Sequence, residues 1–137
     1  MKKITFVLLS LALFILTGCS KKSDNKKIAV FVPGICDDSP SYQMLVEGVT
    51  NAVENFNAKI SDDEKVELFV MEAGTNQAEW GAKLTALSAE QKYDVIISSN
   101  PSLPDLAEPI LQQFPNQKFI LLDATKEGNK NKPLNNN

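Results

Sequence analysis

The sequence predicts an α/β fold in which a doubly wound parallel sheet lies between helices, as one three-layer α/β/α lobe. From residue 28 onward, four short apolar runs of strand length alternate with three amphipathic stretches of helix length. Strands that single helices separate lie parallel, and right-handed crossovers place those helices on both faces of the sheet. We expect the strand order 2-1-3-4, in which a crevice opens where the chain reverses direction between strands 1 and 3.

The expected strands are short apolar runs that are bounded by turn residues. The first, Ile28–Pro33, is apolar throughout, as expected for a strand that is buried on both faces. The later runs are Val66–Met71, Tyr93–Ser98 and Lys118–Asp123.

The first expected helix follows Ser39, which fits an N-cap before Pro40 at the first helical position. Apolar residues then recur at i, i+3 and i+4 on one face, from Tyr42 as far as Phe56.

The other two helices are expected after the second and third strands. Asn76 fits an N-cap for the second helix, and Trp80 in its apolar stripe is interpreted as a core residue rather than a pocket residue. The third helix is expected to begin near Ser102 and to run to about Phe114. Pro109 is expected to kink this helix or to end its first turns.

Residues 1–18 are predicted to be a lipoprotein signal peptide. Two lysines precede an apolar run, Ile4–Leu16, that is shorter than the ~20 residues needed to span a bilayer. The run leads into Leu16-Thr17-Gly18-Cys19, which is typical of a bacterial lipobox. Cys19 is therefore the expected lipidation site, and its acyl chains the membrane anchor. The alternative is an ordinary export signal followed by a plain buried cysteine.

The rest of the chain divides by composition. Residues 19–27 are expected to be the lipidated cysteine and a flexible tether, because Ser20–Lys27 carries four lysines, one acid and no apolar residue. These lysines either face lipid headgroups or only keep the tether soluble. Residues 28–124 are expected to form the single folded lobe. Residues 125–137 are Lys/Asn-rich and without helix or strand pattern, so we expect a disordered tail and an apparent truncation.

The composition excludes several classes of function. The chain has 14 lysines but no arginine and no histidine, and its formal net charge is −3. It therefore lacks an imidazole base or metal ligand and the guanidinium fork that binds phosphate. Asp37 and Asp38 are expected to raise the pKa of Cys36, which disfavours a catalytic thiol. We expect no enzyme activity, no cofactor, no metal and no nucleic-acid partner.

Candidate ligand-binding residues follow the strands, where such sheets bind ligands. Asp38 and Tyr42 follow the first strand, Asn100 follows the third, and Asp123 ends the fourth. Carboxylates accept hydrogen bonds from vicinal hydroxyls or ring N–H groups, and tyrosine stacks on planar rings. This chemistry suits a nucleoside or a sugar.

Each candidate also has a plainer interpretation. Asp37 and Asp38 fit a solvated turn that complements the helix dipole. Tyr42 fits core packing through its spacing to Leu45, and Asn100 before a proline fits turn chemistry.

Several motifs together resemble the basic membrane protein family, whose best-known branch is the purine nucleoside receptor A lipoproteins. They are the lipobox, Asp38–Gly48, Tyr93–Ile97 and Phe114–Asp123, and the similarity spans residues 28–124. Counting back from Gly48 matches Asp38 to the aspartate of the family's Asp-x-Ser-Phe-Asn motif, although Pro40, Ser41 and Tyr42 stand where Ser, Phe and Asn are usual.

The resemblance implies a lipid-anchored substrate-binding protein of an ABC importer, with the type I periplasmic-binding-protein fold. It implies a nucleoside as ligand, an ABC permease as partner and an extracytoplasmic location. It also implies that Asp123 accepts from ribose hydroxyls. Because members clamp the ligand between two lobes, this chain is similar to the N-terminal lobe only. The alternative is an envelope lipoprotein or gene remnant that binds no solute.

Overall fold

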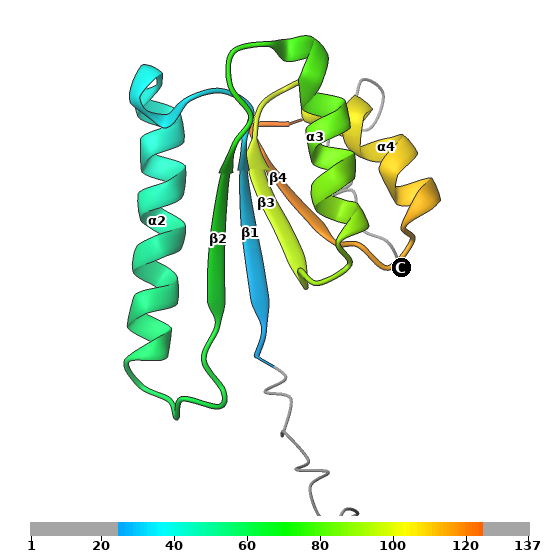
Figure 1. Cartoon of the computed structure of the whole chain (residues 1–137). Coiled ribbons are helices and arrows are strands. Elements are labelled where there is room, and N and C mark those ends of the chain that lie inside the picture. The colour runs from blue at the N-terminus through cyan, green and yellow to red at the C-terminus, as the bar shows by residue number, and fades with distance from the viewer. Residues whose placement is uncertain (1–24, 125–137) are drawn as a thin grey trace, which may run out of the picture.

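The computed structural model describes residues 25–124, which form a parallel sheet with helices on both of its faces (Figure 1). The elements in chain order are β1 (Lys27–Val32), the 3₁₀ helix η2 (Cys36–Asp38), α2 (Pro40–Asn57), β2 (Glu67–Glu72), α3 (Gln77–Ala89), β3 (Val95–Ser99), α4 (Leu103–Gln113) and β4 (Phe119–Leu122).

The sheet has the order β2-β1-β3-β4, and every pair of neighbouring strands is parallel. In the register, Ile28 of β1 lies opposite Leu68 of β2 on one side and Val95 of β3 on the other. The expected fold class and strand order are confirmed. The chain therefore reverses direction between β1 and β3, and the strands end at one common edge, at the top of Figure 1.

The two faces of the sheet are covered by different helices. Successive side chains of a strand point to opposite faces, so Phe31 joins the core under α3 and α4, and Val30 and Val32 join the cluster under α2. All three are fully buried. Trp80 of α3 is 6% exposed and lies in the first of these cores, which confirms its interpretation as a core residue.

The α2 side of β4 is more open than the rest of the sheet. Helix α2 packs on β1, β2 and β3. The side chains of Ile120 and Leu122 remain 48% and 46% exposed. The described part of the chain thus leaves an apolar surface on this edge strand.

Helices α2 and α3 begin at the N-cap residues that the sequence predicts, but the cap of α2 differs in its bonding. Asn76 caps α3 as expected, since its Oδ1 accepts from the Ala78 N–H at 3.3 Å while its Nδ2 donates to Glu79 at 2.8 Å. Helix α2 has Ser39 at its N-cap and Pro40 at its first position, but the Ser39 side chain makes no capping bond.

Pro109 was expected to kink α4 or to end its first turns, and the second of these alternatives is wrong. The helix runs from Leu103 through Pro109 to Gln113. Pro109 and Asp105 are exposed, so the carbonyl that loses its helical donor is open to water. Leu103, Ala107 and Ile110 are buried and hold the opposite side of the helix on the sheet.

The outer segments lie largely outside the described residues. These are the expected signal peptide (1–18), the lipidation site Cys19, most of the tether and the tail (125–137). Strand β1 begins at Lys27, the last residue of the expected tether. Between residues 25 and 124, no helix is both long and apolar enough to cross a membrane.

Candidate functional site

The four candidate ligand-binding residues all lie at the carboxyl edge of the sheet. Asp38 ends η2 after β1, and Tyr42 lies in the first turn of α2. Asn100 follows β3 directly, and Asp123 follows β4. The fold therefore gathers loops from separate parts of the chain at one edge, as parallel strands require.

Two of these residues are in direct contact. The side-chain Nδ2 of Asn100 donates a hydrogen bond to the hydroxyl oxygen of Tyr42 at 3.1 Å. Tyr42 is half-buried and packs on the cluster of Val30, Val32 and Leu45. The ring thus contributes to the core, while its hydroxyl reaches the loop after β3.

Gly34 makes room for the Tyr42 ring. A Cβ atom on Gly34 would lie 2.8 Å from Cε2 of Tyr42, closer than real Cβ contacts. Only glycine therefore lets the ring lie against the turn after β1. Sequence reasoning did not assign this role to Gly34. The available signal was the Pro33-Gly34 pair ahead of an aromatic residue.

Asn100 also shapes its own loop. Its Oδ1 accepts from the backbone N–H of Ser102 at 2.9 Å and from the Ser102 hydroxyl at 2.6 Å. This is the turn chemistry that the sequence offered as an alternative. Both ends of the amide therefore make contacts within the protein, and the expected contact of Asn100 with a ligand stays a prediction.

Asp123 stands at the neighbouring strand end. Its Oδ2 accepts from the Ser99 hydroxyl at 3.2 Å, and Ser99 directly precedes Asn100. The backbone of Asp123 has φ of +52°, in the left-handed region that aspartate tolerates better than most residues. The carboxylate is exposed and retains lone pairs for a further hydrogen bond.

Asp38 stands apart from the other three residues. It is exposed, and no described residue holds its carboxylate through a hydrogen bond or an ion pair. This placement matches a solvated turn, and it also leaves the carboxylate accessible to a solute.

Glu72 is a structural part of this edge that sequence reasoning missed. Its Oε2 accepts from the backbone N–H of Cys36 at 3.1 Å, which ties η2 to the end of β2. Burial, then Glu72 and then Asp37 raise the pKa of the Cys36 thiol. The expected direction is confirmed, but burial is the largest cause, and Asp38 is not among the causes.

The edge is acidic, and it holds no metal cluster within the described residues. Asp37, Asp38, Glu72 and Asp123 are all exposed. Lys83 is engaged elsewhere, because its Nζ donates to the Ala73 carbonyl at 2.7 Å and pairs with Glu79. In the range 25–124, no three His, Cys, Asp or Glu side chains come together as a metal site. Such an edge favours hydrogen-bond donors on a neutral ligand.

Comparison with known proteins decides the family. The model of the Bmp family, described as ABC transporter substrate-binding protein PnrA-like, matches residues 25–134. The chain belongs to this family. Bmp membership implies a small-molecule ligand and an ABC permease as partner.

A solved structure has a similar fold. It is the crystal structure of a fragment of a protein from Peptoclostridium difficile 630, and that protein is classed as a lipoprotein. The similarity has a TM-score of 0.56 at 14% sequence identity, and it covers 77% of this Bmp chain and 80% of that one. At this identity the likeness supports the fold.

Proposed function

We propose that this Bmp protein is an extracytoplasmic lipoprotein, anchored through Cys19, that binds a purine nucleoside or a similar neutral solute for an ABC permease. We also propose that it has no enzyme activity. The observation that carries the ligand class is the arrangement of Tyr42, Asn100 and Asp123 on an edge without a free cation among the described residues.

Each of these residues has a separate role in the proposal. The exposed carboxylate of Asp123 accepts hydrogen bonds from the vicinal hydroxyls of a ribose. The Tyr42 ring, which Asn100 and Gly34 hold in place, offers an aromatic surface for a planar base. Asp38 is placed to accept from a ring N–H.

The charge of the edge selects against phosphorylated ligands. Asp37, Asp38, Glu72 and Asp123 would all repel a phosphate, and the chain has no arginine to offset them. We therefore expect nucleosides to bind better than the corresponding nucleotides.

Ligand binding is tested by Asp123→Ala. The lost charged hydrogen bond should cost ~1.5 to 3 kcal/mol, or about one to two decades in affinity for purine nucleosides. Residues 25–124 supply one wall of a site, so ligand-observed NMR is the suitable measurement for weak binding. Asp63→Ala is the matched control, because Asp63 is exposed in the α2–β2 connection, at the opposite end of the sheet. Equal affinity of the two variants would exclude the proposed role of Asp123.

Anchoring is tested separately with a clickable fatty acid. Wild-type cells should label the protein, and Cys19→Ala should remove the label. Equal labelling of both would contradict anchoring at Cys19. Intact labelling without any nucleoside binding would favour a lipoprotein that carries no solute.

A further inference from the structure

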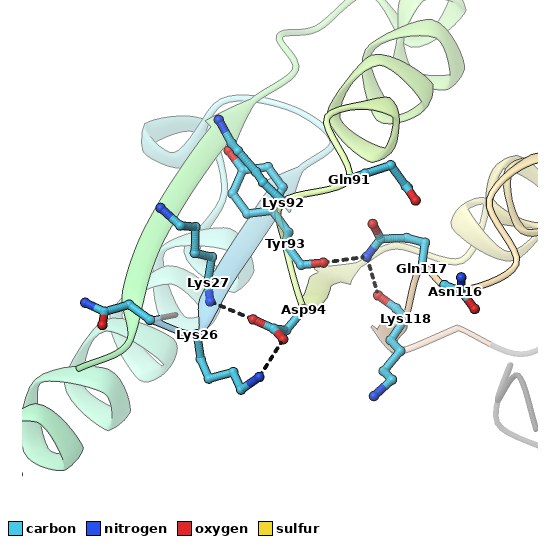
Figure 2. A pocket seen from close by; sticks show the side chains of 10 residues that line it. Lys26, Lys27, Gln91, Lys92, Tyr93, Asp94, Asn116, Gln117 and Lys118 are labelled. Atoms are coloured by element: carbon cyan, nitrogen blue, oxygen red, sulfur yellow. Dashed lines mark hydrogen bonds and ion pairs between the residues drawn. The ribbon is translucent and has the colours of Figure 1, made fainter. Parts of the chain in front are cut away.

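A polar cavity lies at the amino edge of the sheet, opposite the candidate ligand site. Its volume is about 470 Å³. Figure 2 shows four lysines around it, Lys26, Lys27, Lys92 and Lys118, together with Asp94. Lys27 begins β1, while Lys92 and Lys118 lie just before β3 and β4. Parallel strands thus bring together lysines that are far apart in the sequence.

Asp94, the acidic residue that lines this cavity, already has hydrogen-bond and ion-pair partners within the protein. The Asp94 carboxylate accepts from the Lys27 backbone N–H at 2.8 Å and pairs with Lys26 at 3.3 Å. These contacts, with the backbone bond foremost, lower the pKa of Asp94. The Lys26 ammonium and the Lys27 N–H offset part of its negative charge, so Asp94 repels an incoming anion less than a free carboxylate would.

Two of the remaining lysines are held by exposed ion pairs, and Lys92 also lies over the Tyr93 ring, with its Nζ 5.0 Å from the ring centroid. Lys27 pairs with Glu67, and Lys92 pairs with Glu90. Exposed pairs of this kind hold weakly, so the ammonium groups can exchange partners. Within residues 25–124, Lys118 has no carboxylate at ion-pair distance, although it adds to the field that lowers the pKa of Asp94.

The cavity lies close in sequence to the proposed lipid anchor, Cys19. Asn25, which lines it, is only six residues after Cys19. An extended chain spans at most ~3.6 Å per residue, so an acylated Cys19 would hold the cavity within ~20 Å of the bilayer. The acidic carboxyl edge lies at the far end of the strands (Figure 1).

We propose that this cavity binds the phosphate of an anionic phospholipid headgroup and docks the amino edge of the sheet on the membrane. The inference rests on the proposed anchoring for its location. Ammonium groups donate charge-assisted hydrogen bonds to phosphate oxygens. Each lysine near an anionic surface strengthens binding roughly fivefold.

The test uses residues 19–137 with Cys19→Ser, so that no acyl chain contributes. This chain keeps all of the described residues, 25–124. Sedimentation with vesicles of phosphatidylcholine, with and without phosphatidylglycerol, should show binding only to the anionic vesicles. Lys92→Gln with Lys118→Gln should weaken this binding roughly tenfold or more.

The matched control is Lys59→Gln with Lys65→Gln. Both lysines lie in the α2–β2 connection, at the same end of the molecule but outside the cavity, and the charge change is the same. The control should bind nearly as well as the parent. Equal losses in the two double variants would overturn the proposal, since surface charge alone would then explain binding.

Two further results would also overturn the headgroup assignment. One is equal binding to neutral and anionic vesicles. The other is complete displacement by inorganic phosphate at the concentration of the lipid phosphate, which would identify a free-phosphate site. Circular dichroism checks that both variants fold. Because the assay contains no acyl chain, failure here is distinguishable from failure of the anchoring proposal, which fatty-acid labelling measures.

Discussion

The side-chain amide of Asn100 donates to the hydroxyl of Tyr42 at 3.1 Å, across 58 residues of sequence. This bond joins the loop after β3 to the first turn of α2, on the two sides of the point where the chain reverses direction. The orientation of the Tyr42 ring therefore depends on Asn100, which lies in the loop directly after β3.

A double-mutant cycle should measure this bond. Tyr42→Phe removes the acceptor and should lower the free energy of unfolding by about 1 kcal/mol. Asn100→Ala should cost more, because it also removes the acceptor for Ser102. Tyr42→Phe should then have little effect in the Asn100→Ala background, as measured by urea unfolding. Additive losses in the double variant would show that the two side chains are not coupled.

Gly34→Ala should displace the Tyr42 ring. The added methyl would lie 2.8 Å from Cε2, and overpacking of this kind typically costs about 1 to 3 kcal/mol. Gly48→Ala is the control, since Gly48 lies in α2 with open space around it and should gain about 0.5 to 1 kcal/mol. Thermal unfolding of the two variants should therefore shift in opposite directions. A neutral Gly34→Ala would contradict the described contact.

Glu72→Gln should make the Cys36 thiol more reactive. Burial raises the pKa of Cys36 first, and the Glu72 carboxylate raises it further, so removal of the charge lowers the pKa and increases the thiolate fraction. The measurement is the rate of iodoacetamide alkylation at pH 8, in a chain that carries Cys19→Ser. Glutamine can still accept from the Cys36 N–H, so the loop should stay in place. A rate no faster than that of the parent would count against the Glu72 contribution.

Asp94 should stabilise the fold in a pH-dependent way. Its pKa in the folded protein is lowered from 3.8, chiefly by the Lys27 backbone N–H. The stabilisation is therefore complete above that ordinary value and is lost as the pH falls through the folded pKa. Asp94→Asn should lower the free energy of unfolding near neutral pH by less than about 1 kcal/mol, because the group is partly exposed.

The difference between wild type and Asp94→Asn should shrink below pH 3.8, as followed by urea unfolding across a pH series. Lys26→Gln is the control, because it removes a smaller cause of the shift and leaves the backbone bond intact. It should retain most of the pH-dependent stabilisation. A difference that is constant with pH would refute the account.

The exposed side of β4 should promote self-association. Ile120 and Leu122 present apolar side chains on a strand at the edge of the sheet, which is a template for pairing with another chain. Light scattering after size exclusion should show a mass that rises with protein concentration. Ile120→Thr with Leu122→Thr should reduce this rise, whereas Met44→Thr, at an exposed position of α2, should not. A concentration-independent monomer would disprove the prediction.

Much of the fold was predictable because it depends on how apolar and polar residues alternate along the sequence. Apolar runs and helical periodicity predicted the strands and α-helices that lie between residues 25 and 124, and the common doubly wound arrangement predicted their strand order. Asn76 carried its own capping signal. Pro109 does not end its helix, because burial of Ala107 and Ile110 outweighs local helix breaking. The periodicity of the third helix did not reveal that balance, which depends on the sheet beneath it.

The candidate site was predictable in place but not in detail. The strand-end rule located Asp38, Tyr42, Asn100 and Asp123 at one edge, and their contacts with a ligand remain a prediction. The roles of Gly34 and Glu72 depend on approach distances between separate segments, such as the bond from Glu72 to the Cys36 N–H. No local sequence signal encodes such distances.

The central place of β1 affects when the sheet can assemble. Its partners arrive late: Lys27 pairs with Glu67, and Ile28 pairs with Val95, 67 residues further along. Closing such long loops has an entropic cost before any contact compensates for it. A nascent chain that has emerged only as far as β2 holds a two-stranded ribbon, which is at best marginally stable. Such a chain therefore has no closed sheet until β3 emerges and pairs with the other side of β1.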